Sequence, residues 1–111
     1  MKASKEKILE DIFCADIDRR GVQYSRQYKC KKGRIDILTE STIYELKYEL
    51  NRYNIQTAIG QLLIYKLNFT KEYKLAIVTA KIAENFQRDY LDITEPFNIM
   101  VICLSENSFP F

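Results

Sequence analysis

The amino-acid sequence predicts an α/β protein, and two observations lead to this class. Apolar residues recur at helical spacing in two long segments, whereas five other segments are short apolar runs or alternate between apolar and polar residues. In chain order the predicted elements are a helix, three strands, a helix, a strand, a short helix and a strand. The chain has 111 residues, of which 47 % are hydrophobic and 29 % are charged, so a single domain spanning residues 1–111 is expected.

The first expected element is a helix over residues 4–20. Ser4 can cap its start, and Gly21 follows its end as a normal stop signal. Five apolar residues recur at helical spacing and would form one buried face: Ile8, Leu9, Ile12, Phe13 and Ile17.

Three strands are expected next, over residues 22–30, 34–39 and 42–49. A turn that contains Gly33 separates the first strand from the second. The second and third strands are separated by Glu40 and Ser41 alone, which predicts a tight hairpin.

The second half of the chain predicts a helix over 52–68, a buried strand over 73–79, a short helix over 82–91 and a last strand over 98–104. Gly60 lies in the middle of the second helix, where glycine is about 1 kcal/mol less favourable than alanine. Close packing of that helix on the sheet would explain the choice of glycine.

The hairpin carries the pattern of greatest chemical interest. A two-residue turn would place Asp36 opposite Glu45 and Arg34 opposite Lys47, with all four side chains on one face of the sheet. The other face would be apolar and formed by Ile35, Ile37, Tyr44, Leu46 and Tyr48. Opposed carboxylates repel each other, and a divalent cation would offset the repulsion because hard cations bind carboxylate oxygens. The alternative is an ordinary solvated hairpin face.

Composition excludes several other chemistries. The chain contains no histidine, which rules out Ser-His-Asp catalysis, Cys-His catalysis and histidine zinc sites. Its three cysteines are scattered, so a disulfide framework, structural zinc and an iron–sulfur cluster are not expected. No apolar run reaches the roughly 18 residues of a membrane span, and no signal-peptide block is present, which predicts a cytoplasmic protein.

The spacing of Asp36 and Glu45-Leu46-Lys47 resembles the PD-(D/E)XK nuclease superfamily, and within it the small RecB-like and Holliday-resolvase-like nucleases. Ile35 stands where the family name has proline. The resemblance covers roughly residues 6–80 and implies a restriction-endonuclease-like αβββαβ core with a central mixed sheet flanked by helices.

The resemblance also implies roles for individual residues. Asp36, Glu45, the carbonyl of Leu46 and Glu10 on the first helix would bind Mg²⁺ or Mn²⁺, and Glu6 is the substitute for Glu10. Lys47 would orient the attacking water or stabilise the developing charge. In the second helix, Gln61 and Tyr65 resemble the Q-x-x-x-Y element of the RecB-like branch and share one helix face. The alternatives are a solvated carboxylate for Glu10 and a polar helix edge for Gln61 and Tyr65.

A cluster of positive charge accompanies the first hairpin and predicts contact with DNA phosphates. It places five cations within nine residues: Arg26, Lys29, Lys31, Lys32 and Arg34. The alternative is a hairpin tip that is merely soluble.

Together these features predict a Mg²⁺-dependent deoxyribonuclease, with an endonuclease favoured because the chain is too small for a recognition domain. Small size also favours a homodimer, which would suit cleavage of two strands. Three other functions stay open: an exonuclease of the RecB-like branch, a non-catalytic nucleic-acid-binding module with the same fold, and an interaction protein without a nucleic-acid role.

Overall fold

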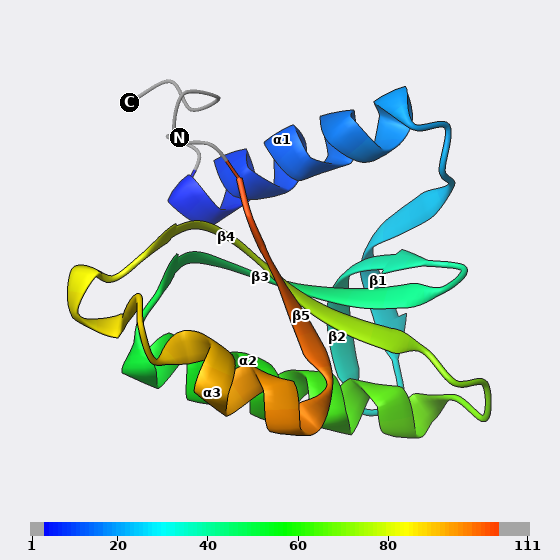
Figure 1. The fold of residues 1–111 in the computed structure, drawn as a ribbon. Helices are drawn as coiled ribbons and strands as arrows, with labels where there is room; N and C mark the ends of the chain where they lie inside the picture. Colours follow the sequence, from blue (N-terminus) through cyan, green and yellow to red (C-terminus); the bar gives the residue numbers. More distant parts are fainter. Residues whose placement is uncertain (1–3, 105–111) are drawn as a thin grey trace.

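The computed structural model describes residues 4–104, in which one five-stranded sheet lies between two layers of helix (Figure 1). Helix α1 (Lys5–Arg19) covers one face of the sheet. Helices α2 (Arg52–Tyr65) and α3 (Tyr90–Thr94) cover the other face. No helix of residues 4–104 is long and apolar enough to cross a membrane.

The strands lie side by side in the order in which they occur along the chain. They are β1 (Tyr24–Cys30), β2 (Gly33–Thr39), β3 (Thr42–Leu50), β4 (Lys74–Ile82) and β5 (Ile99–Cys103). The first three strands pair antiparallel, and β3–β4 and β4–β5 pair parallel. Parallel neighbours require a crossover, which α2 supplies for the first pair and the α3 segment for the second. The predicted α/β class with a mixed sheet flanked by helices is confirmed, and it is compatible with a restriction-endonuclease-like core.

Side-chain caps fix the starts of the two long helices. The Ser4 hydroxyl accepts a hydrogen bond from the Lys7 amide at 3.0 Å, and the Asn51 side chain accepts one from the Asn54 amide at 2.8 Å. Each cap satisfies a backbone donor that the first helical turn leaves unpaired. Ser4 therefore starts α1 as predicted.

Two hydrophobic cores form because each helix layer buries its apolar face against the sheet. The α1 core contains Leu9, Phe13, Cys14, Ile17, Ile37, Leu46, Val78 and Ala80. The larger α2 core contains Ile35, Ile43, Leu50, Ile55, Ala58, Ile59, Leu62, Tyr65, Leu75, Ile77, Phe86 and Ile99. Strand β4 supplies both cores, because its alternate side chains point to opposite faces of the sheet.

The segment predicted as a helix over 82–91 differs most from expectation. Strand β4 continues to Ile82 because Lys81 and Ile82 pair with the end of β3. A 3₁₀ turn, η2 (Glu84–Phe86), follows and buries Phe86, and α3 begins only at Tyr90. Strand pairing has extended the sheet into a segment whose local sequence is compatible with a helix.

Helix α2 ends earlier than predicted, at Tyr65, and its last turn tightens into η1 (Lys66–Asn68). Another short 3₁₀ turn, η3 (Glu95–Phe97), leads into β5.

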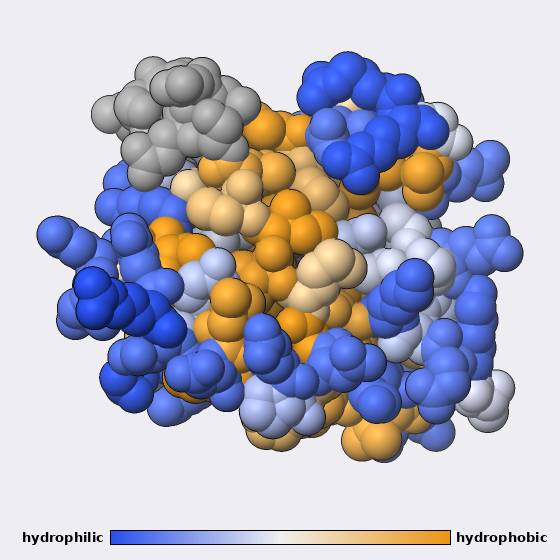
Figure 2. All heavy atoms as spheres, in the orientation of Figure 1, coloured by the Kyte–Doolittle hydropathy of each residue, from blue (hydrophilic) through white to orange (hydrophobic). Residues whose placement is uncertain are grey.

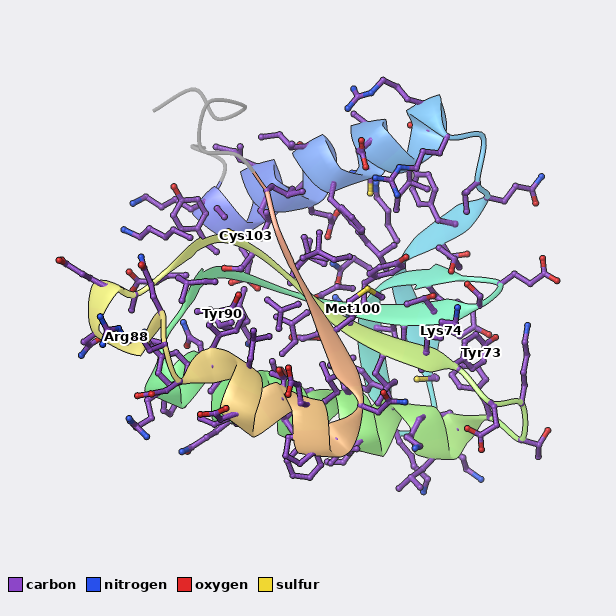
Figure 3. The ribbon with its side chains drawn as sticks, viewed as in Figure 1. Tyr73, Lys74, Arg88, Tyr90, Met100 and Cys103 are labelled. Atoms are coloured by element: carbon purple, nitrogen blue, oxygen red, sulfur yellow. The ribbon has the colours of Figure 1, made fainter. Side chains whose placement is uncertain are left out.

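Strand β5 is an edge of the sheet and carries no charged residue. Apolar side chains gather on the face of the molecule over this strand (Figure 2). Met100 is 48 % exposed there, and Figure 3 shows it on β5 together with Cys103 near the strand end.

Candidate active site

The predicted register of the β2–β3 hairpin is confirmed next to the turn. Leu38 pairs with Ile43, and Ile37 pairs with Tyr44. The ladder between β2 and β3 does not continue to Asp36, so the expected pairs of Asp36 with Glu45 and of Arg34 with Lys47 are not part of it. The pairing of β2 with β3 therefore ends just before Asp36, the acidic residue of β2.

The pairing of β1 with β2 is also interrupted at Asp36. Arg26 pairs with Ile37 and Tyr28 pairs with Ile35, but Gln27 and Asp36, which lie between them, do not pair. Gln27 has a φ of +50°, in the left-handed region. This break turns Ile35 toward the α2 core while Ile37 packs in the α1 core. The prediction that both isoleucines share one face is therefore wrong.

Asp36 uses a backbone donor that the interrupted ladder leaves available. Its Oδ2 accepts a hydrogen bond from the Leu46 amide at 2.9 Å. This contact fixes the Asp36 carboxylate against β3, one residue from Glu45.

Glu45 is 3 % exposed and lies among charged groups. Its Oε2 is 3.6 Å from Lys47 Nζ. Its Oε1 is buried and has no hydrogen-bond donor in the part of the chain that the structure describes. Burial, and then the nearby charge of Asp36, raises the pKa of Glu45 to about 8, although Lys47 opposes the increase. Two acidic groups so close together resist simultaneous ionisation.

Helix α2 brings two predicted residues to the same place. When its amide nitrogen faces the surrounding acceptors, Gln61 donates to Glu45 Oε2 at 2.8 Å and to the Thr57 carbonyl at 3.3 Å. Tyr65 is buried, and burial followed by the charges of Glu45 and Asp36 raises its pKa to about 12. Gln61 and Tyr65 thus lie beside the two carboxylates.

Gly33, the first residue of β2, lies against the ring of Tyr65. A Cβ at this position would be 2.8 Å from Tyr65 Cε1, and the φ of Gly33 is +136°. A glycine is required here, both for the backbone conformation and for the close approach of the ring.

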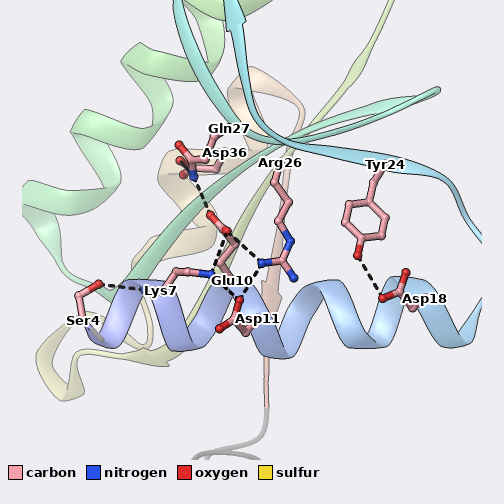
Figure 4. A network of polar contacts seen from close by, with 9 residues as sticks. All are labelled: Ser4, Lys7, Glu10, Asp11, Asp18, Tyr24, Arg26, Gln27 and Asp36. Atoms are coloured by element: carbon pink, nitrogen blue, oxygen red, sulfur yellow. Dashed lines mark hydrogen bonds and ion pairs between the residues drawn. The ribbon is translucent and has the colours of Figure 1, made fainter. Parts of the chain in front are cut away.

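Helix α1 brings Glu10 to the site from the opposite face of the sheet. Glu10 is 7 % exposed, and its Oε1 accepts a hydrogen bond from Gln27 Nε2 at 2.6 Å (Figure 4). Its Oε2 lies 3.4 Å from Arg26 Nη1. The same Gln27 nitrogen lies 3.5 Å from Asp36 Oδ1, so Gln27 connects the two carboxylates.

Glu6, one turn before Glu10, is also near the site. Partial desolvation raises the pKa of Glu6, Lys47 opposes this change, and the charges of Asp36 and Glu10 add to it. Both glutamates that the sequence offers on the first helix therefore lie within electrostatic reach of Asp36.

The predicted basic cluster divides into two parts. Arg26 turns toward α1, where its Nη1 lies 2.7 Å from Asp11 Oδ1, so its charge is already paired. The other four side chains are exposed, and no carboxylate within residues 4–104 pairs with them: Lys29, Lys31, Lys32 and Arg34. We define these four residues as the basic turn.

The chemistry of the donors fits a hard divalent cation. Asp36 and Glu45 supply carboxylate oxygens, and no described residue donates a hydrogen bond to the buried Glu45 Oε1. Among the described residues, however, no three acidic or cysteine side chains are already gathered in a way that could enclose an ion. Asp36 and Glu45 are therefore the pair whose oxygens could take such a cation, while Glu10 is engaged with Gln27 and Arg26.

Sequence reasoning missed Gln27, which contacts two of the predicted site residues. A polar residue inside an expected strand gives no signal of its role. Only its position nine residues before Asp36, across a tight hairpin, could have placed it near the site.

Comparisons with known proteins give a structural relationship alone. No protein-family model matches the chain, and no curated protein matches it significantly. A similar solved structure is that of a repair endonuclease from Pyrococcus abyssi, with a TM-score of 0.65 at 13 % sequence identity. The similarity covers 95 % of this chain and 48 % of that one, so this chain spans about half the length of its neighbour. At this identity the similarity establishes the fold and leaves the activity to the residues of the site.

Proposed function

We propose that this chain is a metal-dependent nuclease that hydrolyses phosphodiester bonds of DNA. One observation carries the proposal: Asp36 and Glu45 lie together at the opening of the β2–β3 ladder, beside Lys47, and the buried Glu45 Oε1 has no donor among residues 4–104. A bound cation would stabilise this arrangement, because it would offset the repulsion between the two carboxyl groups and satisfy the buried Glu45 Oε1.

In this proposal Asp36, Glu45 and the Leu46 carbonyl hold one or two Mg²⁺ or Mn²⁺ ions. When bound, the ion polarises the phosphodiester and lowers the pKa of water. Lys47, 3.6 Å from Glu45, is placed to stabilise negative charge that develops on the phosphate. The Tyr65 hydroxyl is protonated at neutral pH, and its pKa of about 12 extends this to more alkaline solutions, so it can donate a hydrogen bond. Gln61 holds the Glu45 carboxylate in place.

DNA is the substrate that the surface charge supports. The basic turn spans the end of β1 and the start of β2, and its four exposed cations suit phosphate groups. The structural neighbour is described as a repair endonuclease, which supports internal cleavage of DNA over removal of nucleotides from an end.

The test is cleavage of linear, circular, single-stranded and branched DNA with Mg²⁺ or Mn²⁺. We expect Asp36→Asn, Glu45→Gln and Lys47→Ala each to reduce cleavage by at least about 100-fold, because each removes a group that binds the ion or stabilises the transition state. Cutting of the circular substrate would identify an endonuclease.

Glu49→Gln is the matched control. Glu49 lies on the same strand, but its carboxylate is 39 % exposed and pairs with Lys81 at 3.5 Å, away from the site. Its variant should cleave like the wild type. Full activity in all three site variants would contradict the proposal.

A non-catalytic DNA-binding module is the second candidate. It is favoured by the engagement of Glu10 with Gln27 and Arg26, and by the finding that no three acidic side chains of residues 4–104 are gathered in a way that could enclose an ion. Binding of DNA that needs no divalent ion, without cleavage of any of the substrates, would support this candidate instead.

A further inference from the structure

Gln27 has an unusual backbone conformation for a residue inside a strand. Its φ of +50° lies in the left-handed region, which is uncommon and unfavourable for a residue with a Cβ. The ladder pairs on both sides of it, Arg26–Ile37 and Tyr28–Ile35, are intact. The strain is therefore local, and it points the Gln27 side chain toward the acidic residues.

The Gln27 amide nitrogen lies between two carboxylates that come from different elements. It is 2.6 Å from Glu10 Oε1 on α1 and 3.5 Å from Asp36 Oδ1 on β2 (Figure 4). A side-chain amide nitrogen carries two hydrogens, so one nitrogen can serve both acceptors. The amide thereby does what a cation between the two carboxylates would do, since it reduces their repulsion.

We infer that Gln27 is a positioning residue that competes with the divalent cation for Glu10. This inference rests on the proposed function, because it concerns the ion that Asp36 and Glu45 would hold. While the amide stays between Glu10 and Asp36, Glu10 cannot ligate an ion that is bound to Asp36. Direct binding by Glu10 requires Gln27 to move away.

The surroundings of Glu10 explain why the amide can hold it without an ion. Arg26 Nη1 is 3.4 Å from Glu10 Oε2, and Lys7 Nζ is 3.9 Å from the same oxygen. These two cations offset the charge of Glu10, and Gln27 satisfies its other oxygen. In contrast, Glu45 Oε1 has no such donor within the described residues and is available to an ion.

The experiment is a double-mutant cycle of Mg²⁺ and Mn²⁺ binding, measured by calorimetry on the wild type, Gln27→Gly, Glu10→Gln and the double variant. Glycine accepts the left-handed backbone without strain, so Gln27→Gly removes the amide and preserves the local fold. Loss of one hydrogen bond to a carboxylate predicts that Gln27→Gly binds Mg²⁺ about three- to tenfold more tightly than the wild type.

The decisive quantity is how far the effect of Glu10→Gln on Mg²⁺ affinity depends on the residue at position 27. Glu10→Gln alone should change the affinity less than about twofold, because Glu10 does not ligate the ion while the Gln27 amide holds it. In the Gln27→Gly background the same change should abolish the gain. Gln27→Asn is the matched control for the strained backbone, since asparagine tolerates φ above zero but its amide is one methylene shorter.

Each outcome has a distinct meaning. If Gln27→Gly binds Mg²⁺ no more tightly than the wild type, or if the gain persists without Glu10, the competition is refuted while the metal site stands. If none of the four proteins binds either ion, the proposed function and this inference fail together. Thermal unfolding of each variant verifies that a change in affinity does not come from a change in fold.

Discussion

At the scale of single residues, the site is built from groups that would be unfavourable elsewhere. Glu45 is nearly inaccessible to solvent, and a second carboxylate, Asp36, raises its pKa further. Gln27 adopts a left-handed backbone, and Gly33 admits the Tyr65 ring at a distance that no Cβ would allow. Strain of this kind persists only where the surrounding structure determines it, and it is characteristic of functional sites.

Glu45 predicts how stability depends on pH in the metal-free protein. Its folded pKa of about 8 lies above the ordinary value of 4.5, so between these pH values the folded state binds more protons than the unfolded state. The free energy of unfolding should therefore fall as the pH rises from about 5 to about 8, by an amount on the order of a few kcal/mol.

The measurement is urea unfolding over this pH range in the presence of a chelator. Glu45→Gln should flatten the dependence and make the protein more stable than the wild type at the alkaline end. Glu49→Gln, on the same strand but partly exposed, should leave the dependence intact. Parallel pH profiles for the wild type and Glu45→Gln would contradict this account of Glu45.

At the scale of elements, local sequence predicted the helices and strands where periodicity was long. The two long helices, the β2–β3 turn and the register beside it followed from apolar spacing and from Ser4. The change of face at Gln27 and Asp36 could not be predicted, because alternation assumes an unbroken pleat. The pairing of Arg26 with Asp11 joins residues 15 apart in sequence and depends on how α1 docks.

Gly60 in the middle of α2 leads to a second prediction, and the structure also corrects what the sequence suggested about this glycine. Close packing was expected to explain Gly60, but a Cβ placed there meets no atom within 4 Å. Gly60→Ala should therefore raise the free energy of unfolding by about 0.5–1 kcal/mol, because alanine is the better helix former. Denaturant unfolding of the variant and the wild type provides the measurement.

Gly33→Ala is the contrasting variant. The new methyl group would meet the Tyr65 ring, and the φ of +136° would be strained. It should destabilise the protein by more than about 1 kcal/mol. If the two alanine substitutions had equal effects, the packing described for these glycines would be wrong.

At the scale of the whole molecule, the charged residues are unevenly distributed although the net charge is small. The formal net charge is +2, yet the basic turn holds four exposed cations that pair with no carboxylate of residues 4–104, while α1 keeps Arg19, Arg20 and Arg26 in ion pairs. The acidic residues of the site lie between α1 and α2. The net charge alone would conceal a surface that suits a polyanion.

The basic turn predicts the salt dependence of DNA binding. Lys31→Glu should weaken binding and reduce the slope of log affinity against log salt by about 1, because each phosphate contact contributes about 0.9. Fluorescence anisotropy with labelled DNA between about 50 and about 200 mM salt would measure both quantities.

Arg88→Glu is the matched control, with the same change of charge in an exposed segment between η2 and α3, where Figure 3 labels Arg88. Its slope should equal that of the wild type. Equal slopes for Lys31→Glu and the wild type would show that the basic turn does not contact DNA phosphates.

The position of the site between two separate cores has a consequence for incompletely folded chains. Glu10 depends on the docking of α1, Gln61 and Tyr65 depend on the docking of α2, and the two helices pack on opposite faces of the sheet. If either helix layer undocks from the sheet, the site residues on that helix are no longer close to Asp36 and Glu45. A nascent or damaged chain with one helix layer undocked would thus contain only part of the proposed catalytic centre. Nucleic acid would contact all of the site residues only on the fully folded protein.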